Sequence, residues 1–326
     1  MNRPAANQPL LQVDDLVVEF PTRRGTLRAI DGISFHIDPG EVLGVVGESG
    51  AGKSLTGAAI IGLLEPPGRV AGGKITLEGG RIDNLSPEAM RRVRGKRIGA
   101  IFQDPLTSLN PLYSIGRQLT ETITTHLDMT QAQARKRAIE LLAEVGIPAA
   151  ERRIDQYPHQ FSGGMRQRVV IALALCANPR LIIADEPTTA LDVSIQAQII
   201  QLLKRLGRDH GTAVMLITHD MGVIAETADR VAVMYAGRIV EIGQVRQVIK
   251  EPLHPYTVGL MGSIPSVGTE RARLAQIDGA MPRLNAIPKG CAFNPRCPRV
   301  FERCVKERPG LIPKGVSEVA CWLHAR

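Results

Sequence analysis

Short apolar runs alternate with helical patterns from Leu10 to about Lys250. Apolar blocks of four to eight residues, bounded by glycine, proline or polar positions, predict strands, whereas apolar residues three or four positions apart predict helices. This alternation is typical of an α/β domain built around a mainly parallel sheet. We expect strands over Gln12 to Phe20, Ile33 to Ile37, Glu41 to Val46, Lys74 to Leu77, Arg97 to Phe102, Leu181 to Ala184, Ala213 to Thr218, Arg230 to Tyr235 and Arg238 to Glu241.

The pattern changes at two places along the chain. No strand pattern occurs between Ile115 and Asn178, where Gln131 to Val145 and Gly164 to Ala177 both have helical spacing, so we expect a helical insert at about 115–178. After Lys250 prolines become frequent and little regular structure is expected. We therefore predict an α/β domain over 1–250 and a C-terminal extension over 251–326, with a small irregular module from about Ile287 onward.

The longest apolar runs, such as Gly57 to Leu64 and Val169 to Ala177, are far shorter than the roughly 20 residues that span a bilayer. The segment Met1 to Leu11 has no apolar stretch of signal-peptide length. We expect a folded protein that stays in the cytoplasm and has no membrane span.

The formal net charge of +8 is concentrated near the end of the chain. Eleven Lys or Arg residues face four Asp or Glu residues between Arg271 and Arg326, a net charge of +7. Such a tail is compatible with nucleic acid, anionic lipid or an anionic cofactor, and equally with a solvated basic face.

A glycine-rich segment lies between the predicted strand Glu41 to Val46 and a predicted helix from Lys53 to Leu64. A strand, a G-x-x-x-x-G-K-S loop and a helix together form the phosphate-binding P-loop, whose amides and helix N-terminus face an anion. Lys53 is expected to reach the β- and γ-phosphates of ATP, and the Ser54 hydroxyl to bind Mg²⁺. The residues of the loop are Gly47, Glu48, Ser49, Gly50, Ala51, Gly52, Lys53 and Ser54.

Two adjacent carboxylates, Asp185 and Glu186, end the apolar run that begins at Leu181. Neighbouring side chains leave a strand on opposite sides, so the two acids are expected to have different tasks. Asp185 suits Mg²⁺ binding, and Glu186 suits polarisation of the attacking water. His219 follows the strand Ala213 to Thr218, where an imidazole can contact the γ-phosphate.

The segment Phe161 to Arg168 resembles the signature loop of ABC ATPases, with Phe161 and Met165 where Leu and Gln are commoner. Its Ser and glycines open a predicted helix, which makes a second anion site in the domain. In this family two domains stack head to tail, and each signature loop closes on the nucleotide of the partner. The resemblance assigns this contact to Ser162, Gly163, Gly164 and Met165.

Further elements of the family occur in order along about 240 residues. Phe20 is similar to the aromatic residue that stacks on adenine, and Gln103 to the Q-loop residue that touches Mg²⁺ and senses a membrane partner. The sequence Ala190-Leu191-Asp192 matches the D-loop, and His219 matches the switch histidine. The resemblance implies ATP and Mg²⁺ as cofactors, catalytic roles for Glu186, His219 and Gln103, and a RecA-like core with an antiparallel β subdomain and a helical insert.

Finer segments resemble the ATP-binding subunits of bacterial dipeptide and oligopeptide importers. They are Phe102 to Pro111, Tyr157 to Gln160, Ala184 to Asp192 and His254 to Thr257. The resemblance implies a second ATPase subunit, expected to be a paralogue, two transmembrane permease subunits that dock on the segment after Gln103, and an extracytoplasmic peptide-binding protein. It places the chain peripherally on the cytoplasmic face of the inner membrane. The sequence does not choose among peptides, glutathione, nickel chelates and opines as cargo.

The extension carries four cysteines within 31 residues, Cys291, Cys297, Cys304 and Cys321, whereas Cys176 stands alone in an apolar run and is expected to be a buried core residue. Disulfides are disfavoured in the cytosol, so the four indicate a metal centre. Their spacings lack the C-x2-C pairs of zinc ribbons, and Cys297-Pro298 is similar to the Cys-Pro of bacterial ferredoxins. Zinc, a four-iron four-sulfur cluster and reduced thiols remain possible.

Members of the peptide-importer group carry a four-iron four-sulfur cluster in this region, so the resemblance implies that Cys291, Cys297, Cys304 and Cys321 bind one. Four thiolates give such a cluster a net negative charge, which the basic tail would offset.

Two other classes of function compete with transport. A soluble ABC protein acting on DNA or ribosomes is supported only by the basic tail, and the chain has neither a second ATPase domain nor a long coiled-coil insertion. A GTPase is excluded because no Asn-Lys-x-Asp guanine motif is present.

Overall fold

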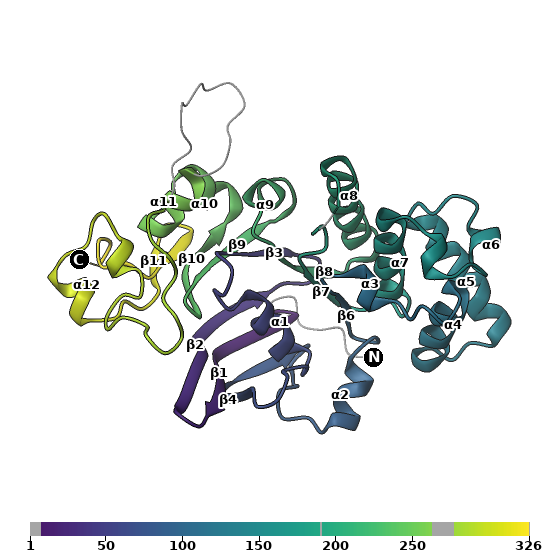
Figure 1. Ribbon diagram of the computed structural model, residues 1–326, viewed down its shortest axis with the longest axis horizontal. Coiled ribbons are helices and arrows are strands. Elements are labelled where there is room, and N and C mark those ends of the chain that lie inside the picture. The colour runs from purple at the N-terminus through teal and green to yellow at the C-terminus, as the bar shows by residue number, and fades with distance from the viewer. Residues whose placement is uncertain (1–7, 190, 263–276, 326) are drawn as a thin grey trace. The chain divides into compact units, whose positions relative to one another are not determined.

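The computed structural model describes residues 8–189, 191–262 and 277–325. These residues form two compact units (Figure 1). Unit 1 contains the described residues of 1–37, 43–83 and 217–326, and unit 2 contains those of 38–42 and 84–216.

Unit 1 contains an antiparallel sheet in the order β2-β1-β4-β5. Strand β2 begins eight residues earlier than the predicted Ile33, because its first half alternates little and is largely exposed, which hides it from a hydrophobic pattern. The strands are β1 (Leu11–Thr22), β2 (Gly25–Ile37), β4 (Arg69–Leu77) and β5 (Gly80–Arg81).

A second group of strands in unit 1 has the order β11-β12-β10-β9-β3. Strand β3 pairs in parallel with β9, and the other neighbours are antiparallel. Every residue of β3 is buried, as expected for a strand covered on both faces. The strands are β3 (Val42–Val46), β9 (Arg230–Tyr235), β10 (Arg238–Gln244), β11 (Ile312–Lys314) and β12 (Ser317–Val319).

The helices of unit 1 are short. Helix α1 ends earlier than the predicted Leu64, since Gly62 adopts a left-handed conformation with φ of 63° just beyond it. They are α1 (Lys53–Ile60), α9 (Met221–Thr227), α10 (Val245–Lys250), α11 (Pro255–Gly262) and α12 (Glu302–Lys306).

The segment after Lys250 is more regular than its prolines predict. Besides α11 and α12 it contributes β12, which pairs with Glu241 to Gly243 of β10. Gly243 is required there, because a Cβ atom would lie 2.1 Å from the Ser317 hydroxyl. This pairing joins residues more than 70 positions apart, and local sequence patterns carry no information about it.

Asp31 of β2 ties the tail to the rest of unit 1. Its carboxylate accepts hydrogen bonds from Arg238 in β10, at 2.7 Å, and from Arg308 beyond α12, at 2.5 Å. Burial alone would raise the pKa of Asp31, but these guanidinium groups outweigh it and hold the pKa below its usual value.

Unit 2 contains the strands β6 (Ile98–Ile101), β7 (Leu181–Asp185) and β8 (Ala213–Ile217), in the order β8-β7-β6, with β6 and β7 parallel. The segment from 115 to 178, all of which the structure describes, contains no strand, as predicted. The helices are α2 (Pro87–Val93), α3 (Pro105–Ser108), α4 (Ile115–His126), α5 (Gln131–Glu144), α6 (Ala150–Arg153), α7 (Gly163–Leu175) and α8 (Val193–His210).

Hydroxyl side chains start the main helices of this segment. The Ser114, Thr130 and Ser162 oxygens accept backbone N–H groups at the beginnings of α4, α5 and α7. These caps satisfy amides that have no partner within the helix. Within the part of the chain that the structure describes, none of the helices has both the length and the apolar character to cross a membrane.

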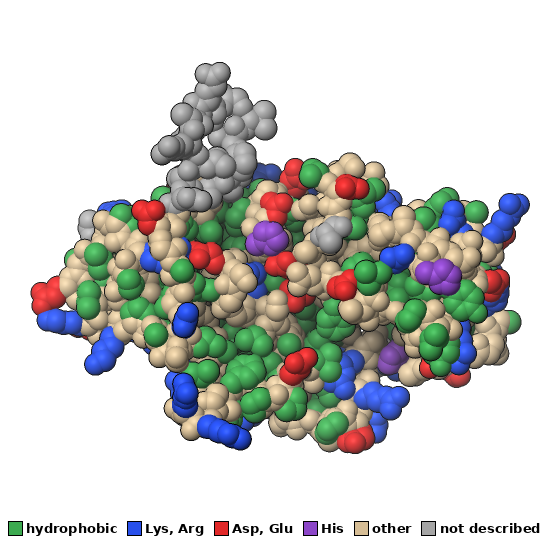
Figure 2. Space-filling model, in the orientation of Figure 1, with side chains coloured by type: hydrophobic (Ala, Val, Ile, Leu, Met, Phe, Trp, Pro, Cys, Tyr) green, Lys and Arg blue, Asp and Glu red, His purple; other side chains and the backbone are tan. Residues whose placement is uncertain are grey.

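Three basic side chains near α12 are paired with acids. Arg303 and Lys306 of α12 contact Glu307 and Glu302, and blue and red side chains lie next to each other over α12 in Figure 2. Arg308 pairs with Asp31, as described above. Glu302 and Glu307 belong to the tail itself, so their two pairs leave its net charge of +7 unchanged.

Candidate functional site

The P-loop turns sharply between β3 and α1 of unit 1. Gly47, with φ of 150°, has no room for a side chain, since a Cβ atom would lie 2.2 Å from the Met234 carbonyl oxygen. Gly52, with φ of 104°, lies directly before α1, where a Cβ atom would meet Ile30 at 2.5 Å. Glycine is therefore needed at both ends of the turn that leads the backbone into the helix.

The Lys53 side chain crosses the loop from the start of α1. Its Nζ donates to the carbonyl oxygens of Gly47, at 2.8 Å, and Glu48, at 3.0 Å, and the residue is only 6% exposed. Ser49, Gly50 and Ser54 are exposed, whereas Ala51 is buried. The loop thus has exposed residues around a buried, positively charged side chain that is held by two hydrogen bonds.

Phe20 and His219 also belong to unit 1. The half-buried ring of Phe20 lies close to Gly68, where a Cβ atom would come within 2.7 Å of it. The Thr218 amide donates to the carbonyl oxygen of Val45 in β3, at 3.2 Å, and β3 leads into the P-loop. The exposed His219 is the next residue after Thr218.

The two carboxylates at the end of β7 belong to unit 2, and both are half-buried. Glu186 has a φ of 45°, in the left-handed region that residues other than glycine seldom adopt. Such strain occurs often where a side chain must be aimed. The strand geometry predicts opposite directions for Asp185 and Glu186, but not this backbone strain.

Two side chains hold the Glu186 carboxylate. Gln103 donates from Nε2 to Oε2 at 3.3 Å, and Thr189 donates from its hydroxyl to the same oxygen at 2.9 Å. The structure therefore brings Gln103 and Glu186 together, as candidates for one chemical step. Sequence reasoning missed Thr189, although its position three residues after Glu186 is compatible with a turn contact.

The signature residues lie at the start of α7, in unit 2. Ser162 accepts the Met165 N–H at 3.4 Å, and Ser162 and Gly163 are exposed. Gly164 allows Ile195 of α8 to approach, because a Cβ atom would lie 2.8 Å from it. The D-loop residue Ala190 lies outside the described residues.

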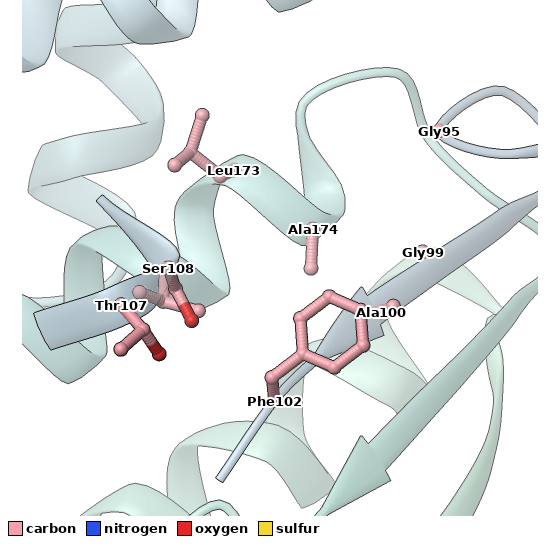
Figure 3. A pocket seen from close by; sticks show the side chains of 9 residues that line it. Gly95, Gly99, Ala100, Phe102, Thr107, Ser108, Leu173 and Ala174 are labelled. Carbon is pink, nitrogen blue, oxygen red and sulfur yellow. The ribbon is translucent and has the colours of Figure 1, made fainter. Parts of the chain in front are cut away.

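A cavity of about 390 Å³ opens in unit 2 at Phe102, the residue before Gln103. Phe102, a residue that is 46% exposed, lies next to Ala100 and Ala174, and Thr107 and Ser108 of α3 face it from the other side (Figure 3). An exposed aromatic ring over an apolar hollow is typical of a protein contact site.

The four cysteines of the tail line one small cavity in unit 1, together with residues that include His254, Phe293 and Trp322. All four are free thiols, and Cys176 lies elsewhere, buried as expected. Across residues 8–189, 191–262 and 277–325, however, no group of three or more His, Cys, Asp or Glu side chains is placed to hold a single metal ion. The cysteines converge without forming the tight shell of a mononuclear site.

Burial raises the pKa of Cys291 to about 11, and the neighbouring Cys321, Cys304 and Cys297 raise it further in that direction. Burial also lowers the pKa of His254 to about 3, and its Nδ1 accepts the Tyr256 N–H at 3.0 Å. Burial therefore favours the neutral thiol at Cys291 and the neutral imidazole at His254.

Comparison with known proteins gives two family matches. Residues 30–189 match the ABC transporter family, and residues 240–304 match the C-terminal region of oligopeptide and dipeptide transporters. The chain is 54% identical to the oligopeptide transport ATP-binding protein OppD of Bacillus subtilis, over 96% of this chain and 88% of that protein. It is 47% identical to the dipeptide transport ATP-binding protein DppD of Escherichia coli K12, over 93% and 92% of the two chains.

Among solved structures, the chain is similar to the ATP-binding cassette MJ0796 in a dimeric post-hydrolysis state bound to ADP and Pi. The TM-score is 0.65 at 28% identity, covering 72% of this chain and 99% of that one. The fold and the P-loop, together with this similarity, define an ATPase of the ATP-binding cassette class. Within that class, the chain belongs to the family of oligopeptide and dipeptide transport ATP-binding proteins.

Proposed function

We propose that this chain is the ATP-hydrolysing motor of an importer that carries dipeptides or oligopeptides through a membrane permease. The supporting observation is that the similarity to peptide-transport proteins extends through the C-terminal region as well as the cassette. We accordingly treat 1–250 as the nucleotide-binding domain and 251–326 as an extension specific to this group, with the protein peripheral on the cytoplasmic face of the membrane.

The proposed chemistry begins with the phosphates of ATP. The amides of Gly47 to Ser54 and the Lys53 ammonium bind them, and Phe20 stacks on the adenine. Ser54, Gln103 and Asp185 would hold Mg²⁺, which neutralises charge on the phosphate oxygens.

Glu186 is the proposed general base for the attacking water. Its contacts with Gln103 and Thr189 support this role, because they fix the direction of the carboxylate before water arrives. His219 contacts the γ-phosphate. Ser162, Gly163, Gly164 and Met165 close on the nucleotide of a second ATPase subunit, which we expect to be a paralogue.

The cavity beside Phe102 is the proposed docking site of a permease segment. Its partly apolar lining and the exposed Phe102 support a protein partner, and Leu106, which is 62% exposed, extends the apolar surface along α3. Two permease subunits and an extracytoplasmic peptide-binding protein complete the assembly.

Reconstitution of the chain with its permease subunits in lipid vesicles tests the proposal. Binding protein loaded with peptide is expected to stimulate ATP hydrolysis, and Phe102→Asp to reduce that stimulation by about tenfold, because it places a charge in the apolar docking site. Phosphate release measures the stimulated hydrolysis in the wild-type chain and in Phe102→Asp. Val316→Asp, at another exposed apolar position, is the matched control.

Stimulation of ATP hydrolysis by glutathione, a nickel chelate or an opine, but not by peptide, would contradict the proposal that peptides are the cargo. Co-purification with nucleic acid or ribosomes rather than with membrane subunits would contradict transport and favour a soluble ABC ATPase.

For the tail we propose a four-iron four-sulfur cluster bound by Cys291, Cys297, Cys304 and Cys321. The donor set supports it, since four free thiols line one cavity, and each thiolate of such a cluster binds a different iron rather than sharing one ion. A mononuclear zinc site needs four ligands at about 2.0–2.3 Å from one ion, a shell absent from the described residues. The cluster would join the tail segments into one structural unit.

Anaerobic purification followed by iron and sulfide analysis tests this assignment. We expect about four irons and four sulfides per chain, reduced by Cys297→Ser but not by the control Cys176→Ser. A colourless, iron-free protein with four free thiols, or one that retains zinc, would contradict it.

A further inference from the structure

The tail contacts Glu48, which is one of the residues of the P-loop. The Glu48 N–H donates to the Tyr256 hydroxyl oxygen at 2.9 Å, and the Glu48 carboxylate accepts Arg296 Nη1 at 3.0 and 3.1 Å. Because Lys53 binds the Glu48 carbonyl oxygen, this residue is held through its amide, its carbonyl and its side chain. Two of these three contacts come from beyond residue 250.

The Arg296 side chain is also held in place by contacts other than the one with Glu48. Its Nε donates to the Asp278 carbonyl oxygen at 2.8 Å, and its Nη2 to the Ile277 carbonyl oxygen at 3.2 Å. Its side chain is only 7% exposed, whereas that of Glu48 is 30% exposed. The guanidinium therefore reaches the loop with little freedom to move, which lowers the entropic cost of holding Glu48.

Tyr256 is fully buried in an aromatic cluster. Its ring centroid lies 4.7 Å from that of Tyr235 and 5.5 Å from that of Phe293, and Arg296 lies 5.8 Å from the centroid of Tyr235. The tyrosine and the arginine are thus parts of one packed cluster that ends on Glu48.

The charge of Glu48 gives this cluster a functional consequence. A carboxylate within a loop that binds phosphates repels them unless a cation offsets it. Arg296 supplies that cation from the tail. Methionine at position 281, also in the tail, lies against Gly50, where a Cβ atom would come within 3.2 Å of its methyl group.

We propose that Arg296 and Tyr256 are positioning residues for nucleotide binding: they hold the Glu48 backbone in the phosphate-binding turn, and Arg296 cancels the charge of Glu48. The inference rests on the proposed phosphate-binding role of the loop. It makes ATP affinity a property of the tail as well as of the cassette.

Fluorescent ATP and ADP analogues, titrated into the purified full-length chain, test the inference. Arg296→Met is expected to weaken ATP binding about tenfold and ADP binding less, because ATP carries more charge, and the loss shrinks at high salt. Arg296→Lys restores part of the affinity. Adding Glu48→Gln to Arg296→Met also restores part of it, because the unpaired carboxylate is then gone. Arg283→Met, at an exposed arginine of the same segment, is the control with the same charge change.

Tyr256→Phe removes only the acceptor of the Glu48 amide, and is expected to weaken ATP and ADP binding equally. Melting temperatures confirm folding, and Arg296→Lys and the double variant remain informative if Arg296→Met does not fold. A folded Arg296→Met that binds ATP as the wild type does, or a double variant no better than Arg296→Met, overturns the inference. A wild-type chain that binds no ATP would instead overturn the proposed function itself.

Discussion

Replacement of Glu186 by glutamine is expected to reduce ATP turnover by about a hundredfold or more, while ATP binding persists. Glutamine keeps the size of the side chain, and its carbonyl oxygen can still accept the hydrogen bonds from Gln103 and Thr189. What it lacks is the basic carboxylate that is proposed to polarise the attacking water. Steady-state phosphate release and equilibrium nucleotide binding separate the two effects.

Glu151→Gln is the matched control, since it neutralises an exposed carboxylate of unit 2. Its turnover is expected to equal that of the wild type. Turnover retained in Glu186→Gln would refute the general-base assignment, and loss of ATP binding in that variant would show that Glu186 acts on the nucleotide rather than on water.

Replacement of Lys53 by alanine is expected to weaken ATP binding by about a hundredfold, because a nearly buried cation that is proposed to bind the phosphates is lost. The change also removes the two hydrogen bonds that Lys53 donates to Gly47 and Glu48, so the loop loses part of its own support. Calorimetric titration with ATP measures the effect.

Lys74→Ala provides the comparison. Lys74 is also a lysine of unit 1, but it forms an exposed pair with Asp14, and such pairs contribute little. Equal ATP affinities of Lys53→Ala and the wild-type chain would contradict the proposal that the P-loop binds ATP.

The P-loop and the acidic end of β7 were predictable because each is local. The loop is a contiguous run between a strand and a helix, and Asp185 ends a buried apolar strand that Glu186 directly follows. The backbone of Glu186 was not predictable, since a φ of 45° is imposed by the surroundings and leaves no mark on the residues beside it.

The contacts of Glu48 lie beyond the reach of any local pattern. Tyr256 is 208 positions away and Arg296 is 248 positions away, and each lies in a segment whose prolines predict irregular structure. The clustering of four cysteines indicated a metal centre, but only the fold shows that the four thiols line one cavity. Tertiary packing, rather than propensity, decides both features.

The end of the sheet in unit 1 has a consequence for solubility. Without the tail, β10 would present an unpaired row of N–H and C=O groups, the kind of edge on which another chain can add as a strand. Strand β12 covers that row, and the new outer strand β11 is only three residues long and contains Pro313 and Lys314. Proline lacks a donor, and lysine resists desolvation, so the tail ends the sheet with an edge that discourages aggregation.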